Sequence, residues 1–131
     1  MKTLTLKQPY ATWIAEGIKE YEFRTWKTSY RGDILIHAGK GKNKESFKKY
    51  EHLNLEYPSS CIIAMVTIED CIEVTDEFRE FLKFKNPILY SHIITDKDWK
   101  GYAFKISNVR KINPSPASGR LSFWEFDINK K

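Results

Sequence analysis

The residues best suited to chemistry lie in one short segment, Gly17 to Arg24, with the sequence GIKEYEFR. Four of its positions form the pattern Gly-x-Lys-x-x-Glu-x-Arg, which brings Lys19, Glu22 and Arg24 together. In an extended chain, Glu22 and Arg24 share one strand face about 7 Å apart. A carboxylate between two cations stays ionised, and the cationic groups are then available to a phosphate, carboxylate or carbonyl oxygen.

A simpler interpretation of the same residues is a structural ion pair. Glu22 and Arg24 would then pair with each other across a solvated sheet face. Surface ion pairs are common and contribute little stability, so spacing alone favours this interpretation. The surroundings of the segment in the chain must therefore decide between a ligand site and a surface pair.

The elements on either side place this segment at a junction. Alternating polar and apolar residues predict an N-terminal strand, and Pro9 suits the first turn of a short helix that follows it. From residue 20 onward the period becomes two, which puts Glu22, Arg24 and Trp26 on one face of a strand. The charged segment thus lies where a helix gives way to a strand.

The rest of the chain continues this mixed pattern. Further strands are predicted over 34–38, 60–74, 101–112 and 121–126, helices over 45–53 and after Thr75, and loops over 39–44 and 113–119. The stretch 83–100 has no clear pattern. Five or six short strands with two or three inserted helices predict an α+β fold, a small and partly closed β-barrel, because closure removes exposed sheet edges. A length of 131 residues fits one domain over 1–131.

The composition of the chain indicates what kind of partner it binds and in which cellular compartment it resides. Lys and Arg number 22 against 17 Asp and Glu, which favours an anionic partner without specifying a reaction. Cys61 and Cys71 fall in one extended segment, about 30 Å apart, so no disulfide is expected. No apolar run approaches about 20 residues, and no cationic leader opens the chain, so we expect a cytoplasmic protein. We also expect it to be a monomer. Scattered cysteines and histidines predict no metal site, and nothing calls for a cofactor.

Several motifs occur in an order that resembles one known family. These are LKQPYA at 6–11, the Gly-x-Lys-x-x-Glu-x-Arg-x-Trp series at 17–26, YRG at 30–32, ILIHA at 34–38, GYAF at 101–104 and the closing strand at 119–126. Together they resemble an ASCH domain over nearly the whole chain. The resemblance implies a PUA-like β-barrel, a fold associated with RNA recognition, in which the polar motif residues line a cleft.

The resemblance also implies roles for individual residues. Lys19, Glu22 and Arg24 would line a ligand cleft, whose wall Gln8, Tyr10 and Trp26 would complete. Trp26 is equally suited to stacking on a nucleobase and to closing the barrel as a core residue. The candidates for nucleic-acid backbone contacts are Arg31, Lys40, Lys42, Lys105 and Arg120, of which Lys40 and Lys42 lie in an expected mobile loop.

Three functions remain open at this point. The first is binding of RNA or a nucleoside in the charged cleft. The second is hydrolysis of RNA or of an acylated nucleoside, with Lys19, Glu22 and Glu69 as candidate catalytic residues. A branch resembling this motif removes the acetyl group of acetylcytidine with a Lys, a Thr and a Glu, but Glu22 occupies the Thr position and lacks a hydroxyl. The third is a protein-interaction adaptor without a small ligand.

Overall fold

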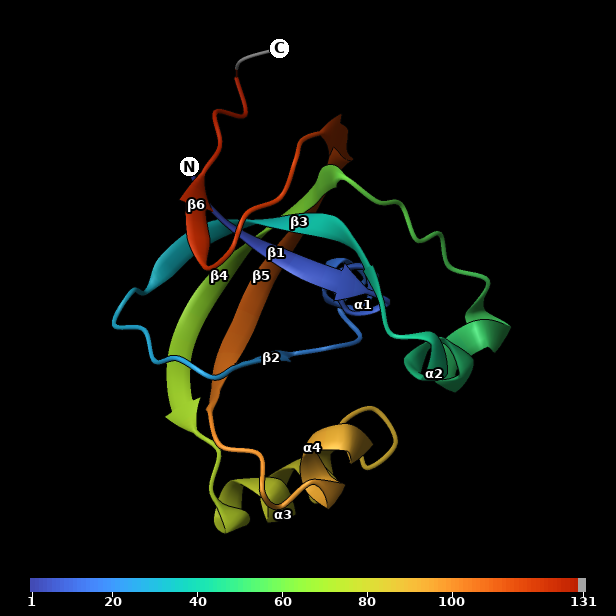
Figure 1. The fold of residues 1–131 in the computed structure, drawn as a ribbon, viewed down its shortest axis with the longest axis vertical. Coiled ribbons are helices and arrows are strands. Elements are labelled where there is room, and N and C mark those ends of the chain that lie inside the picture. Colours follow the sequence, from blue (N-terminus) through green and yellow to red (C-terminus); the bar gives the residue numbers. More distant parts are fainter. Residues whose placement is uncertain (130–131) are drawn as a thin grey trace.

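The computed structural model describes residues 1–129 and contains one curved six-stranded sheet with short helices packed around it (Figure 1). The elements are β1 (Lys2–Gln8), α1 (Tyr10–Ala15), β2 (Tyr21–Arg24), β3 (Gly32–Lys42), α2 (Lys44–Phe47), the 3-10 helix η1 (Lys48–Leu53), β4 (Cys61–Glu73), α3 (Asp76–Lys85), α4 (Ser91–Thr95), β5 (Tyr102–Pro116) and β6 (Phe123–Glu125). The predicted α+β class is confirmed. Within residues 1–129, four short α-helices and η1 replace the expected two or three helices.

The sheet is curved but does not close, so the predicted barrel is not confirmed. The strand order is β2-β5-β4-β3-β1-β6, with β1 parallel to β3 and the other pairs antiparallel. The edge strands β2 and β6 are short and do not pair with each other in the described chain. Side chains approach across the gap instead: the Trp26 ring centroid lies 5.1 Å from that of Phe123.

Two apolar clusters make up the core. One lies between the curved sheet and α1, and it includes Leu4, Ile14, Ile36 and Phe104. The other gathers aromatic residues of β2, α3 and α4, among them Tyr21, Phe78 and Tyr90. Because β2 alternates its side chains, Tyr21 and Phe23 enter the second cluster while the charged side chains face the other way. The predicted two-residue period is confirmed over β2, whereas Thr25 and Trp26 lie beyond the end of this strand.

The predicted glycine and lysine loop over 39–44 is wrong, because β3 continues to Lys42. Gln8 of β1 pairs with Lys42, and the Asn43 amide donates to the Gln8 carbonyl over 2.9 Å. Glycine is needed here: a Cβ at Gly39 would lie 2.9 Å from Thr5 Cγ2 on the neighbouring strand. Lys40 and Lys42 are therefore held on a paired strand rather than on a mobile loop.

The predicted loop over 113–119 also proves partly to be strand. β5 runs to Pro116, and Ser115 and Pro116 pair with the start of β4. The unassigned stretch 83–100 contains the end of α3 and all of α4. The predicted cap at Thr75 is confirmed, since its Oγ1 accepts a hydrogen bond of 3.1 Å from the Phe78 amide.

Two expectations about the environment can be compared with the fold. Cys61 and Cys71 are free thiols on the same strand, β4, ten positions apart. Within residues 1–129, no helix is long and apolar enough to cross a membrane.

Candidate functional site

Lys19 and Glu22 form a buried ion pair at the entry to β2. Lys19 Nζ donates to Glu22 Oε1 over 2.8 Å and also to the Tyr21 carbonyl. Only 2% of Lys19 and 7% of Glu22 are exposed. The predicted grouping of charges therefore exists, but it is built into the protein interior rather than laid on a solvated sheet face.

Arg24 completes the arrangement on the other side of Glu22. Its Nη2 lies 3.1 Å from Glu22 Oε2 and donates to the Thr5 carbonyl over 2.7 Å, which ties β2 to β1. Within residues 1–129, Arg24 Nε has no hydrogen-bond partner although it is buried. Glu22 thus has one cation at each carboxylate oxygen, while Arg24 retains donors that no described residue satisfies.

The electrostatics of the pair follow from burial and from these neighbours. Burial alone would raise the pKa of Glu22, but Lys19 and Arg24 outweigh it and hold that pKa below its usual range. For Lys19, burial is the largest influence and lowers the pKa despite the nearby Glu22 carboxylate. Glu22 is therefore anionic at neutral pH, as its sequence position predicted.

A cleft of about 450 Å³ opens beside Glu22 and Arg24. Its lining includes Thr5, Lys7, Tyr10, Glu22, Phe23, Arg24, Lys40, Arg120 and Leu121, which come from β1, α1, β2, β3 and the segment before β6. Lys19 does not line this cleft. Its Nζ lies behind the wall, 5.6 Å from the Tyr10 ring centroid and 5.0 Å from that of Phe23. The cleft thus combines a fixed carboxylate, an arginine and the tyrosine Tyr10.

Comparison with known proteins decides the family. The family model of the ASCH domain matches residues 4–116. The chain belongs to the ASCH domain family. Activating signal cointegrator 1 of Mus musculus is 27% identical over 138 residues, and that of Homo sapiens is 29% identical over 137. Each alignment covers 95% of this chain and 22% of the relative, so the chain spans about a fifth of these relatives.

Solved structures share the ASCH fold at low sequence identity. An ASCH protein from Zymomonas mobilis superposes with a TM-score of 0.64 at 14% identity, covering 98% of this chain and 88% of that one. The Y47F mutant of that organism's protein gives a TM-score of 0.58 at 16% identity, covering 88% and 74%. At these identities the likeness shows the fold alone.

Two predicted wall residues of this ASCH domain face elsewhere. The Gln8 amide is fully buried, donates to Thr12 Oγ1 over 3.0 Å and to the Pro58 carbonyl over 2.9 Å, and accepts from the Thr12 amide. Trp26 packs edge-on against Phe104 at 5.2 Å between ring centroids, which fits its core alternative. Neither residue lines the cleft, whereas Tyr10 does.

The third predicted catalytic residue lies away from the cleft. Glu69 and Lys105 line a separate hollow of about 490 Å³ that also touches Lys19. Glu22 faces the cleft on the other side. The fold therefore does not gather Lys19, Glu22 and Glu69 around one cavity. Within residues 1–129, no group of three His, Cys, Asp or Glu side chains gathers to hold a metal ion.

The five predicted backbone-contact residues are dispersed. Lys40 and Arg120 border the cleft, and Lys42 is exposed at the end of the same strand as Lys40. Arg31 lies near Asp70, with 3.5 Å between Nη2 and Oδ1. Lys40 and Arg120 are thus the two that the fold places beside Glu22 and Arg24.

His92 belongs to the surroundings of the cleft although sequence reasoning passed over it. Its ring stacks on Tyr10 with 5.7 Å between centroids, and it meets Phe23 edge-on at 6.0 Å. Within residues 1–129, its Nδ1 is buried without a hydrogen-bond partner. Burial, helped by Lys19 and Lys49, lowers the pKa of His92 to about 4. It lies 68 residues beyond the end of the motif at Arg24, so no local spacing could have found it.

The depressed pKa of His92 predicts a loss of stability in mild acid. Below about pH 6.5 the unfolded chain binds a proton at this histidine that the folded chain does not, so stability falls as the pH drops toward 4. Between pH 7 and pH 4.5, His92 should cost about 2 kcal/mol of unfolding free energy. The variant His92→Phe keeps an aromatic ring against Tyr10 but cannot bind this proton. Its unfolding free energy should therefore fall by correspondingly less between pH 7 and pH 4.5. Urea denaturation at both pH values measures this, and equal losses in both proteins would contradict it.

Proposed function

We propose that this ASCH domain binds RNA or an RNA-derived nucleoside in the cleft beside Glu22 and Arg24. The observation that carries the proposal is Arg24 itself, which lines the cleft and whose Nη2 is held by Glu22 and Thr5, while among residues 1–129 its Nη1 makes no hydrogen bond. A guanidinium held in this way suits a carbonyl or phosphate oxygen. The family's association with RNA recognition and the net charge of +5 agree with an anionic or carbonyl-rich ligand.

The other groups of the cleft have roles that follow from their chemistry. Tyr10 offers aromatic surface to a nucleobase, and stacking of this kind contributes about 1 to 3 kcal/mol per base. The Glu22 carboxylate accepts hydrogen bonds from base or ribose donors and cannot donate. Lys19 acts through Glu22, because it neutralises that carboxylate from behind and does not line the cleft.

Removal of the Arg24 guanidinium provides the test of this proposal. We expect Arg24→Gln to weaken binding about ten- to a hundredfold, since hydrogen bonds to charged groups contribute about 1.5 to 3 kcal/mol. The protein is incubated with a total RNA digest and with acetylcytidine, and mass spectrometry records bound and converted species. Equal retention by wild type and Arg24→Gln would contradict the proposal.

Arg110→Gln is the matched control for this experiment. Arg110 is also a partly exposed arginine in an ion pair, with 2.9 Å between its Nη2 and Asp33 Oδ1. It lies on β5 and lines neither the cleft nor the hollow around Glu69. Its replacement should leave ligand retention unchanged.

The same experiment separates binding from hydrolysis. A lowered pKa at Lys19 favours a role for the free amine as a base. Against this, Lys19 Nζ is engaged by Glu22 and the Tyr21 carbonyl, and Glu69 lies at another hollow. Conversion of RNA fragments or acetylcytidine by the wild type would make the domain a hydrolase, whereas retention of unaltered ligand would make it a binding module.

The adaptor hypothesis receives no support from the cleft. A cleft filled by its own side chains would have favoured a domain without a small ligand. The cleft instead encloses about 450 Å³, within the range of about 300 to 1,000 Å³ that is usual for ligand pockets.

A further inference from the structure

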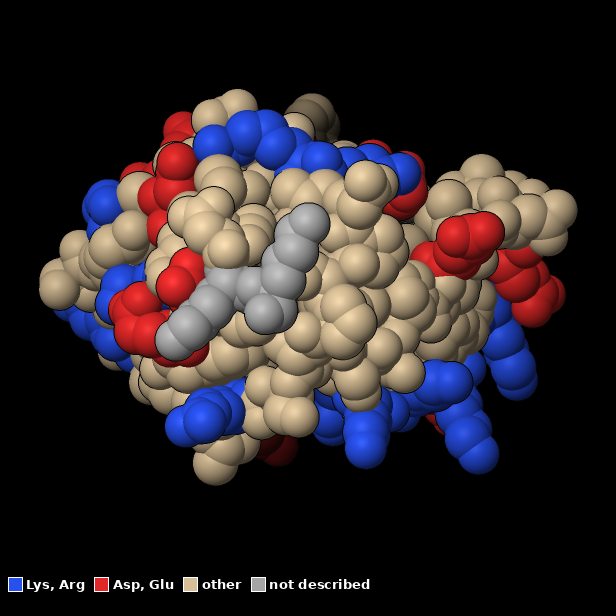
Figure 2. Space-filling model, turned by 90° about the horizontal axis from the view of Figure 1, so that it is seen from above, with Lys and Arg blue, Asp and Glu red and all other residues tan. Residues whose placement is uncertain are grey.

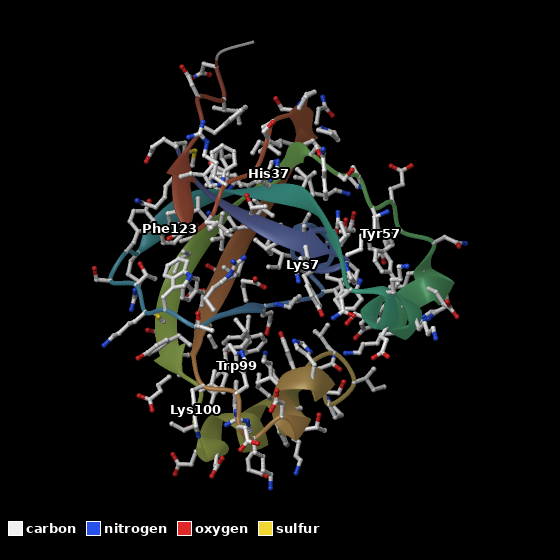
Figure 3. All side chains as sticks on the ribbon, in the orientation of Figure 1. Lys7, His37, Tyr57, Trp99, Lys100 and Phe123 are labelled. Atoms are coloured by element: carbon white, nitrogen blue, oxygen red, sulfur yellow. The ribbon has the colours of Figure 1, made fainter. Side chains whose placement is uncertain are left out.

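A second hollow of about 450 Å³ adjoins the cleft. The two cavities share part of their lining, namely Thr5, Gly39, Lys40, Arg120 and Leu121. They are therefore two parts of one groove that crosses β1 and β3. Lys7 lines only the cleft and His37 only the second hollow, and both are labelled in Figure 3.

The shared wall between the two cavities is basic. Lys40 and Arg120 are exposed there, and among residues 1–129 neither has a carboxylate within 4.0 Å. Lys and Arg side chains project along the lower margin of the view in Figure 2, with few acidic side chains between them. Two unpaired cations at the junction of two cavities would suit one negative group that joins two ligand units.

The far wall of the second hollow is built from polar groups and backbone. His37 holds it in place, because its Nε2 lies 2.7 Å from the Ala117 carbonyl, which can only accept a hydrogen bond. The chain then passes so close to His37 that a Cβ at Gly119 would lie 2.9 Å from the His37 ring. Ser60 and Ser118 also line the hollow. This wall offers hydroxyl and peptide groups to a ribose or a base edge.

We infer that the second hollow binds a neighbouring nucleotide, so that the ligand is a single strand of RNA rather than a free nucleoside. The inference rests on the proposed function and specifies its ligand. One nucleotide occupies the cleft beside Arg24, the next occupies the hollow beside Ser118, and Lys40 and Arg120 bind the phosphate between them. A single strand of RNA in this groove places two neighbouring nucleotides in the two adjacent pockets. A duplex has no unpaired base to place in either pocket.

The test compares ligands that fill one or both cavities. The probes are the four ribonucleoside 5′-monophosphates and a mixed-sequence RNA tetranucleotide, titrated calorimetrically at 50 mM NaCl. We expect the wild type to bind the tetranucleotide at least about fivefold more tightly than any monophosphate, since one added stacking or charged contact contributes about 1 to 3 kcal/mol.

A variant that fills only the second hollow makes the test specific. Ser118 is exposed, and it lines the second hollow but not the cleft. Ser118→Trp should remove the preference for the tetranucleotide while leaving monophosphate binding unchanged, which also reports an intact fold. Ser29→Trp, at an exposed serine outside both cavities, is the matched control and should bind both probes like the wild type.

The phosphate contact has its own readout. For the tetranucleotide, Lys40→Ala and Arg120→Ala should each reduce the slope of log Kobs against log salt concentration by about 0.7.

The outcomes distinguish the two levels of the proposal. If the monophosphates bind but the tetranucleotide binds no more tightly than they do, the second site is refuted and the proposed function stands. The same conclusion follows if Ser118→Trp binds the tetranucleotide with the affinity of the wild type. If neither probe binds the wild type, the proposed function fails and the inference falls with it.

Discussion

Replacing Lys19 with methionine is expected to lower the unfolding free energy by about 3 to 5 kcal/mol at pH 7. Methionine keeps the apolar stem but removes the ammonium group that contacts Glu22 and the Tyr21 carbonyl. The Glu22 carboxylate, 7% exposed, would then keep only Arg24 as a partner, and the Tyr21 carbonyl would lose its side-chain donor. Urea denaturation of both proteins measures the loss.

A surface ion pair of the same spacing serves as the control for Lys19. Lys83 and Glu80 are also three residues apart, with 3.3 Å between Nζ and Oε1, but the two side chains are 54% and 72% exposed. Lys83→Met should therefore change the unfolding free energy by less than about 1 kcal/mol. If Lys19→Met lowers the unfolding free energy as little as Lys83→Met does, the buried pair does not stabilise the start of β2.

The same substitution also tests how Lys19 acts. If its role is to hold Glu22, the double variant Lys19→Met/Glu22→Gln should be more stable than Lys19→Met alone, because a neutral amide costs less to bury than an unpaired carboxylate. Strictly additive losses in the two single variants would contradict this coupling.

Replacing Arg79 with methionine should cost about 3 kcal/mol or more of unfolding free energy. Arg79 is 4% exposed and donates from α3 to three backbone carbonyls: Nε to Ile93 over 3.0 Å, and Nη2 to Asp96 over 3.1 Å and to Trp99 over 2.6 Å. Each buried carbonyl left without a donor costs about 1 to 3 kcal/mol. Denaturation measures the loss, and faster amide exchange over 91–95 would locate it in α4.

The ion pair of Arg79 provides the contrast. Asp76 Oδ1 lies 3.7 Å from its Nη1, but the Asp76 side chain is 91% exposed. Asp76→Asn should therefore have a small effect compared with Arg79→Met, because the carbonyl bonds hold the segment and the surface carboxylate does not. Similar losses in both variants would reverse this assignment. Since α4 carries His92, an Arg79 variant should also loosen the packing against Tyr10.

What the sequence determined by itself was the local order of the charged segment. The two-residue period after residue 20 put Glu22 and Arg24 on one strand face, and Lys19 three residues before Glu22 was close enough to pair with it. Pro9 and the Thr75 cap marked the starts of two helices, although Pro9 precedes its helix by one residue rather than lying inside the first turn. These predictions held because backbone periodicity and capping depend on neighbours a few residues away.

The tertiary structure decided which of these residues share a cavity. Lys19 lies behind the cleft wall, the Gln8 amide is used by Thr12 and Pro58, and Glu69 lies at another hollow. The curvature of the sheet and the register shifts in β1, β3, β4 and β5 set these positions. Neither feature can be predicted from the local spacing of residues in the sequence.

The same reason explains the residues that sequence reasoning missed. His92 reaches Tyr10 across the fold, from a segment that Arg79 ties to α3 through the Ile93 carbonyl. Arg120 and Lys40 border one groove although they are 80 positions apart, because β6 pairs with β1 and β1 with β3. Contacts between distant segments depend on the global packing of the chain, so the motif predicted the charged site and only the fold revealed the groove around it.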